Sequence, residues 1–236
     1  MKSLLPLTKG QWTNHEYASH KDSFMQAKIE TIFREVLTDL GSDEATGNQL
    51  WSELSSAYTG RARYYHNLHH LDHLLAELLP LKDILADWQS IVFAIAYHDI
   101  IYSIRKSDNE ERSAAVAQLR LKKAGFTDVR IARCVSHILY TKGHGTSPDP
   151  DANLFTDGDL SVLGSAPAKY QEYVKQIRRE YGLYPSFVYN PGRIKVLSHF
   201  LAMPQIFKTD FFRDRYESQA RINLQWELGE LKPDKP

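Results

Sequence analysis

Apolar residues recur every three or four positions along most of this chain, which is the spacing of one face of an α-helix. A first series runs from Met25 to Leu40 and stops at Gly41, a residue suited to a left-handed helix cap. Similar series follow at residues 50–58, 68–78, 91–102, 114–121, 131–138, 152–162, 170–181, 194–201 and 212–224. No stretch of useful length alternates between apolar and polar residues, as a half-buried strand would. The pattern predicts an all-α fold.

The composition is that of a soluble globular protein and excludes a disordered chain. Of the 236 residues, 42% are hydrophobic and 25% are charged. Twenty-nine basic residues balance twenty-nine acidic ones, so the chain has no overall field that would hold a nucleic-acid polymer or an anionic membrane. Any anionic substrate must therefore be bound by local charges.

Signals of export or membrane insertion are also missing from the sequence. The single cysteine, Cys134, can form no intrachain disulfide, which is what a reducing cytoplasm permits. The apolar run near the N-terminus is too short for a signal peptide, and no stretch approaches the roughly 18 apolar residues of a membrane span. These features predict a soluble, cytoplasmic protein.

No internal repeat, low-complexity tract or change of composition marks a linker within the chain. We therefore expect one helical domain over residues 23–231. An irregular arm is expected before it at 1–22, and a disordered tail after it at 232–236. The sequence does not indicate an oligomeric state.

Four of the ten histidines lie within eight residues, in the segment YHNLHHLDH at 65–73. If a helix begins near His66, then His66, His70 and His73 lie on one face and His69 points elsewhere. We interpret His73 as a core or supporting residue. Imidazole nitrogen is a common metal ligand, but a catalytic metal needs several protein ligands, so the chain must bring others to His70.

The best candidates for these other ligands come from two further predicted helices. His98 and Asp99 lie in the segment 91–102, which is apolar on nearly all sides, so they are expected to be buried deeply. Adjacent residues on a helix diverge by about 100°, so the pair can share a metal only if it lies between their two directions. Asp159 shares a predicted helical face with apolar neighbours, whereas Asp157 faces about 200° away. The candidate ligands are therefore His70, His98, Asp99 and Asp159.

Together these motifs resemble those of the HD-domain metal-dependent phosphohydrolases, which are named for a histidine, a His-Asp pair and a distant aspartate on a helical fold. More narrowly, YHNxxH at 65–70, HD at 98–99 and DLS at 159–161 are similar to segments of cyclic-nucleotide phosphodiesterases, although the chain is too short to be one. From about Tyr65 to Glu227 the chain also resembles a group of small bacterial HD proteins predicted to be phosphohydrolases. The resemblance implies a single HD-type helical bundle with a metal site between its central helices.

The resemblance also implies roles for these residues. In the phosphodiesterase pattern the residue in the place of His66 is the general acid and the one in the place of His70 binds metal, whereas a simpler HD alignment makes His66 the ligand. The first division suits the chemistry, because a ligand histidine must be deprotonated while a leaving alkoxide needs a proton. A bound metal lowers the pKa of water from about 15.7 toward 7 to 9, and Asp99 or Asp159 could orient or deprotonate that water.

The expected cofactor is one or two divalent ions of Mn, Mg, Fe, Co, Ni or Zn. His137 and His144 are candidates for a second ion, because some HD branches carry extra histidines before the last aspartate. However, His144 also fits a solvated loop residue and His137 a hydrogen-bonded helix residue. Lys142, Arg63 and Arg193 are the cations that we expect at a substrate phosphate, and each also fits a surface charge.

We therefore expect a metal-dependent phosphohydrolase acting on a phosphate ester or anhydride, with a nucleotide as the preferred substrate class. Walker and Rossmann glycine patterns are missing, so a nucleotide would not be held by a glycine-rich cradle. One alternative is an HD-type di-iron oxygenase of a small molecule. Another is a non-catalytic sensor or structural protein in which a closed metal site staples helices together.

Overall fold

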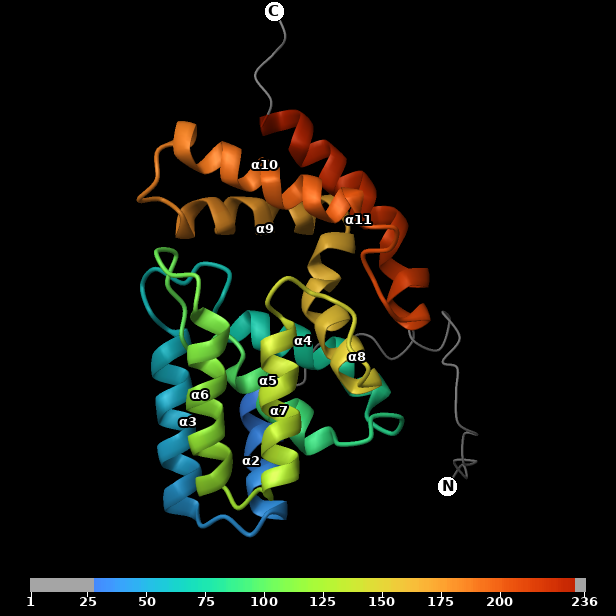
Figure 1. Ribbon diagram of the computed structural model, residues 1–236. Helices are drawn as coiled ribbons and strands as arrows, with labels where there is room; N and C mark the ends of the chain where they lie inside the picture. Colours follow the sequence, from blue (N-terminus) through green and yellow to red (C-terminus); the bar gives the residue numbers. More distant parts are fainter. Residues whose placement is uncertain (1–27, 232–236) are drawn as a thin grey trace, which may run out of the picture.

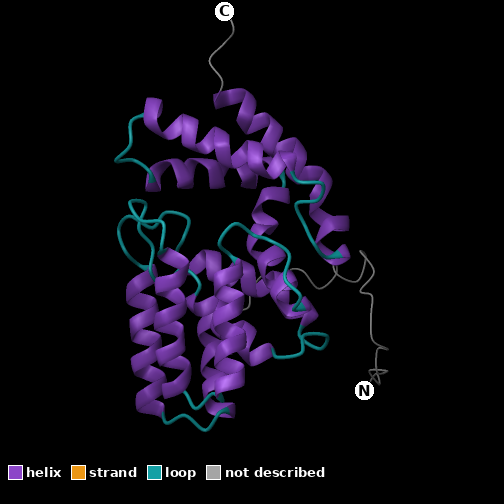
Figure 2. Ribbon diagram, viewed as in Figure 1, coloured by secondary structure: helices purple, strands orange, loops and turns teal. Residues whose placement is uncertain are grey.

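The computed structural model describes residues 28–231, and all of their regular structure is helical (Figure 2). The predicted all-α fold is therefore confirmed, whereas the expected arm at 1–22 and tail at 232–236 lie outside the described residues. None of the described helices is long and apolar enough to cross a membrane. The elements are α2 (Ile29–Asp39), α3 (Glu44–Tyr58), α4 (Leu68–Leu78), the 3₁₀ helix η1 (Leu79–Leu81), α5 (Trp88–Tyr97), α6 (Asn109–Lys123), α7 (Asp128–Tyr140), α8 (Pro150–Leu160), the 3₁₀ helix η2 (Ser161–Gly164), α9 (Pro167–Glu180), α10 (Ser186–Ala202) and α11 (Asp210–Leu231).

The helices form two groups that meet at a central layer (Figure 1). Helices α2, α3, α5, α6 and α7 run side by side, and α9 and α10 lie across one end of them. Helix α11 packs along α10 and η2. Between the two groups, α4 and α8 contact each other and both contact α5. The three helices that carry the histidine and aspartate motifs are thus neighbours in the middle of the molecule.

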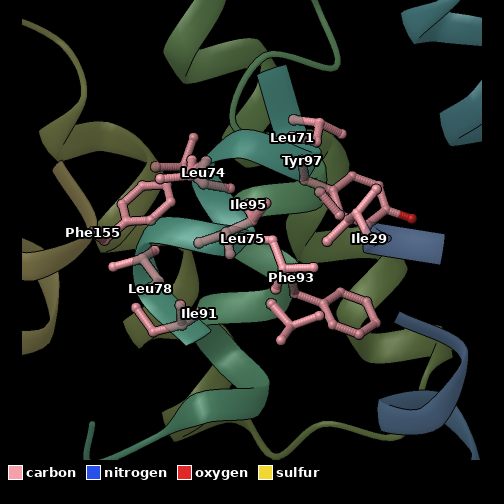
Figure 3. Packing of buried hydrophobic residues seen from close by; sticks show 14 of the residues in the cluster. Ile29, Leu71, Leu74, Leu75, Leu78, Ile91, Phe93, Ile95, Tyr97 and Phe155 are labelled. Carbon is pink, nitrogen blue, oxygen red and sulfur yellow. The ribbon is translucent and has the colours of Figure 1, made fainter. Parts of the chain in front are cut away.

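Helix α5 is the centre of the core, as its uniformly apolar sequence predicts. All of residues 90–97 are buried. Figure 3 shows leucines of α4 packed against α5, with Ile29 of α2 and Phe155 of α8 at the edges of the same cluster. This single cluster includes buried residues from all ten described α-helices, and each fully buried large side chain contributes about 1.5–3 kcal/mol. The backbone that carries the motifs is therefore held firmly on several sides.

Helix α4 begins where the apolar series at 68–78 begins, which leaves His66 outside the helix. Its N-cap is Asn67, whose side-chain oxygen accepts a hydrogen bond from the backbone N–H of His69 at 2.9 Å. The helix starts at Leu68, so the start near His66 that would put His66, His70 and His73 on one face does not occur. His66 consequently precedes the helix and does not continue the face of His70.

Helix α5 ends earlier than predicted, at Tyr97 instead of Tyr102, with His98 as its C-cap. The reason is that side chains from elsewhere bind the backbone that follows. Arg63 donates to the carbonyls of Asp99 and Ile100 at 2.7 and 2.9 Å. The N–H of Asp99 donates to the Tyr58 hydroxyl at 3.2 Å. These bonds satisfy the polar groups that a longer helix would have paired internally.

Candidate metal centre

Three side chains meet at one point between α4, α5 and α8. His70 lies in the first turn of α4, His98 caps α5, and Asp159 lies next to the last residue of α8. The two histidine Nε2 atoms are 3.1 Å apart, and Asp159 Oδ1 is 3.2 Å from the first and 3.6 Å from the second. Atoms bound about 2.1 Å from one ion are separated by about 3 to 3.4 Å. The three side chains therefore have the spacing of a ligand set.

The hydrogen-bond partner of His98 Nδ1 indicates which ring nitrogen carries the proton. His98 Nδ1 lies 3.0 Å from the backbone carbonyl of Ile95, which can only accept, so Nδ1 carries a proton. In the neutral ring Nε2 then carries a lone pair, and this nitrogen faces carboxylate oxygens of Asp99 and Asp159. Acceptors that face one another require a cation between them, either a proton or a metal ion. The donor set present therefore fits a metal.

Asp99 completes the group from the side of the solvent. Its Oδ2 lies 3.2 Å from His98 Nε2. The histidines are buried, whereas the side chains of Asp99 and Asp159 are 20% and 15% exposed. The structure thus brings together all four residues that the sequence suggests as ligands, with nitrogen on the buried side and oxygen on the open side.

The carboxylates and histidines of this group shift one another's pKa values. Burial favours neutral His98, but Asp99 and Asp159 outweigh it and raise the pKa of His98 to about 9. Burial opposes ionisation of Asp159, yet His70 and His98 lower its pKa to about 2, and His98 likewise holds the pKa of Asp99 below its usual range. Burial lowers the pKa of His70. Without a metal, the positive charge in the group is thus a proton on His98.

His66 lies beside this group and is held by Glu180, the last residue of α9. His66 Nδ1 is 2.7 Å from Glu180 Oε2, while the other carboxylate oxygen accepts the backbone N–H groups of Tyr65 and His66 at 2.8 and 2.9 Å. The hydroxyl of Tyr102 donates to Glu180 at 2.8 Å, and its ring stacks on His66. The free Nε2 of His66 is 3.9 Å from Asp99 Oδ2. The imidazole is therefore fixed with one nitrogen toward the acidic side of the candidate centre.

This surrounding favours a protonated His66. Burial disfavours the charge, but the hydrogen bond to Glu180 and the nearby Asp99 outweigh burial and raise the pKa of His66 above 6.5. Burial also opposes ionisation of Glu180, and the His66 bond lowers its pKa despite this. The pair thus favours an imidazolium held by a buried carboxylate.

Glu180 is a site residue that no sequence motif marks, although its position in the helical pattern carries a signal. Glu180 follows Ile177 by three positions and Tyr173 by seven, so it continues the buried face of α9. An acidic residue at such a core position must be paired. Its position in the helical pattern could have marked it as a functional residue, but not its partner.

A cavity of about 700 Å³ opens beside the candidate ligands. That volume lies within the range of about 300–1,000 Å³ typical of small-molecule sites. Helices α9 and α10 line one side, and the segments that follow α5 and α7 line the other (Figure 1). His66, His98, Asp99, His144 and Asp159 all lie on its wall. A small molecule in this cavity would contact both the candidate metal ligands and His66.

The two histidines suggested for a second ion have different positions. His144 has a left-handed backbone, with φ of 51°, between two glycines, and its Nε2 lies 4.0 Å from Asp159 Oδ2. Burial lowers its pKa to about 4. His137 is buried away from the group, with Nε2 3.3 Å from Asp149. The structure therefore brings His144, and not His137, to the candidate centre.

The three suggested phosphate-binding cations are all engaged with other groups. Arg63 binds backbone carbonyls, including that of His66, and does not line the cavity. Arg193 lines the cavity but binds the carboxylate of Glu227 through two bonds of 2.7 and 2.9 Å. Lys142 also lines it and pairs with Glu111.

Asp157 and Asp159 have different partners in the structure. Asp157 accepts hydrogen bonds from the backbone N–H groups of Lys208 and Thr209 at 3.0 and 2.8 Å, and it forms an ion pair with the side chain of Lys208. It therefore fastens the segment before α11, while Asp159, two positions further on, faces the histidines. His73 likewise lies outside the group, with Nε2 3.3 Å from the Ser161 hydroxyl.

Comparisons with known proteins do not identify a family for this chain. No family model matches it, and no curated protein and no solved structure is significantly similar to it. The likeness to HD proteins thus rests on the motifs, and the candidate centre on its geometry.

Proposed function

We propose that this protein is a divalent-metal-dependent phosphohydrolase that cleaves a phosphate ester or anhydride of a small molecule, such as a nucleotide. One observation carries the proposal. The acceptor atoms of His70, His98 and Asp159 converge on one point, and His98 and Asp159 line a cavity there beside a fixed imidazole. A nitrogen and oxygen ligand set with a neighbouring general acid is what metal-assisted hydrolysis requires.

The ligand set suits a catalytic ion. Mixed imidazole and carboxylate ligands bind Mn²⁺, Fe²⁺, Co²⁺, Ni²⁺ and Zn²⁺, and Mg²⁺ accepts the carboxylates. The exposed side of Asp99 and Asp159 leaves room for water or substrate oxygen toward the cavity. When bound, such an ion would lower the pKa of a coordinated water and so supply hydroxide at neutral pH.

The residues around the ion would manage the protons of the reaction. The water oxygen forms a bond to phosphorus while the bond from phosphorus to the leaving oxygen breaks. His66 donates its Nε2 proton to the leaving oxygen, and Glu180 keeps the ring oriented through Nδ1. The proton lost by the water passes to a carboxylate of Asp99 or Asp159. From Asp99, whose Oδ2 lies 3.9 Å from His66 Nε2, the proton can return to His66 through one bridging water and restore the starting state.

The two alternative functions have less support in this geometry. A di-iron oxygenase needs a second ligand set, and of the two extra histidines only His144 approaches the group. A metal that merely staples helices would be enclosed by protein ligands on all sides. Here the acidic side of the group lies on a cavity wall. Both alternatives remain outcomes of the following test.

The test combines metal analysis with turnover. We would purify the protein, quantify bound metal, and measure phosphate release from a panel of nucleotides and phosphate esters with Mn²⁺, Mg²⁺, Co²⁺ or Ni²⁺. The His98→Ala/Asp99→Ala variant should lose both metal and turnover. The His69→Ala variant is the matched control, because His69 is an exposed neighbour of His70. Bound iron with oxygen consumption and no phosphate release would indicate the oxygenase, and metal without any turnover would indicate a structural site.

A further inference from the structure

Helix α10 presents an apolar face to the cavity. Val188, Gly192, Val196 and Phe200 are spaced four residues apart and all line it. The two valines are 46% and 43% exposed, although they belong to a wall that surrounds the candidate site. This wall offers apolar surface to whatever occupies the cavity.

Gly192 makes a recess in this face. A Cβ atom built at Gly192 would meet nothing within 4 Å, and the backbone there does not have the positive φ that favours glycine. Glycine inside a helix is less stable than alanine. Packing and backbone geometry therefore do not require a glycine here, and the open position in the cavity wall lets a ligand approach the helix closely.

The charges that line the cavity limit how much phosphate it can hold. Three lysines and arginines line the cavity, and of these Lys142 pairs with Glu111 and Arg193 with Glu227. Within the part of the chain that the structure describes, Lys106 is the lining cation without an ion pair. Glu110 adds a negative charge to the same wall. One free lysine and a metal can neutralise one phosphoryl group, but a chain of phosphates would bring further charges without partners.

Aromatic rings supply a second kind of surface. Six tyrosines line the cavity and add aromatic surface to its wall, although the ring of Tyr102 already stacks on His66. They are Tyr65, Tyr102, Tyr173, Tyr181, Tyr184 and Tyr189.

We infer that the substrate carries a single phosphoryl group on a largely apolar or aromatic body, and that this body packs along α10 against the recess at Gly192. The inference rests on the proposed function and specifies the substrate class of the same site. Gly192 is then a specificity-determining residue, because any side chain at that position would occupy the space of the substrate's apolar body and would not contact the candidate metal ligands.

The experiment measures binding separately from turnover. With the Mn²⁺-loaded protein, calorimetry gives dissociation constants for 2-(1-naphthyl)ethylphosphonate, ethylphosphonate and tripolyphosphate, with Mn²⁺ in excess. The naphthyl compound should bind at least about tenfold more tightly than the other two, since even one methylene in an apolar pocket changes selectivity by about tenfold or more. Equal or tighter binding of tripolyphosphate would overturn the inference.

The Gly192→Ala variant locates the subsite. It should weaken binding of the naphthyl compound by about tenfold and leave ethylphosphonate unchanged, since it adds one methyl group to the recess. Its thermal stability should equal or exceed that of the wild type, because alanine favours the helix. Gly229→Ala is the matched control, an exposed glycine of α11 with nothing within 4 Å of a Cβ and no place on the cavity wall. Unchanged naphthyl binding in Gly192→Ala would place the body elsewhere and overturn the inference.

Turnover distinguishes the two proposals. The esters 2-(1-naphthyl)ethyl phosphate and ethyl phosphate have leaving oxygens of similar basicity, so a difference in kcat/KM between them reports on the apolar body. Hydrolysis without preference for the naphthyl ester would overturn the substrate class alone. Absence of hydrolysis for every phosphate tested would overturn the proposed function.

Discussion

Metal binding to this protein should release one proton from His98 near neutral pH. The metal-free group holds that proton because Asp99 and Asp159 outweigh burial and raise the pKa of His98 to about 9. A histidine ligand must offer a lone pair, so an ion has to displace the proton. His70 contributes no second proton in this range, because burial lowers its pKa below 6.5.

The size of the effect follows from the pKa. Below the pKa of about 9 the proton is bound almost fully, so each unit of pH changes the apparent Kd of the metal tenfold. Raising the pH from 6.5 to 8.5 should therefore tighten binding about a hundredfold, which corresponds to about 2.7 kcal/mol.

Calorimetric titration with Ni²⁺ measures both quantities. Repeating it in buffers of different ionisation enthalpy counts the released protons, and repeating it across pH gives the slope. The exposed His69→Asn variant should behave as the wild type, whereas His98→Asn should lose high-affinity binding. An apparent Kd that does not change between pH 6.5 and 8.5 would refute the proton on His98. Absence of binding by the wild type would refute the centre itself.

Three further outcomes follow from the same contacts. Glu180→Gln removes the charge that raises the pKa of His66, so kcat/KM should fall about a hundredfold and the alkaline limb of its pH profile should move to lower pH. In the metal-free protein the stability that His98 contributes is complete below its unfolded pKa of 6.5 and is lost as pH rises through about 9, so urea unfolding should show a loss on the order of 3 kcal/mol between pH 6.5 and 9.5. A Cβ at Gly164 would lie 2.6 Å from the backbone oxygen of Tyr216, so Gly164→Ala should cost about 3 kcal/mol in the same assay, whereas Gly229→Ala should not destabilise the protein.

The sequence predicts the local features of this fold well, because helical periodicity records which face of each segment is buried. The uniformly apolar segment became α5, and the left-handed cap expected at Gly41 has φ of 74°. The same reasoning chose Asp159 rather than Asp157 as the ligand, and the structure directs Asp159 to the histidines, although Asp157, which binds Lys208, is the more buried of the two. Such predictions need only the position of a residue within its own helix.

Contacts between distant elements are what the sequence could not supply. Glu180 binds His66 across 114 positions, and no local pattern links the two. The same limit applies to the cations. Whether Arg193 is free for phosphate depends on Glu227, which lies 34 positions further along the chain. A charge is visible in the sequence, but its partner is a property of the fold.

Helix ends explain how adjacent residues can serve one centre. Had α5 continued to Tyr102, His98 and Asp99 would diverge by about 100° and could share an ion only if it lay between their two directions. The helix instead stops at Tyr97, and Asp99 turns so that its Oδ2 lies 3.2 Å from His98 Nε2. Arg63 maintains this turn by binding the carbonyls of Asp99 and of His66. The arginine that the sequence suggested for phosphate therefore holds the backbone of both His66, the proposed general acid, and Asp99, a proposed metal ligand.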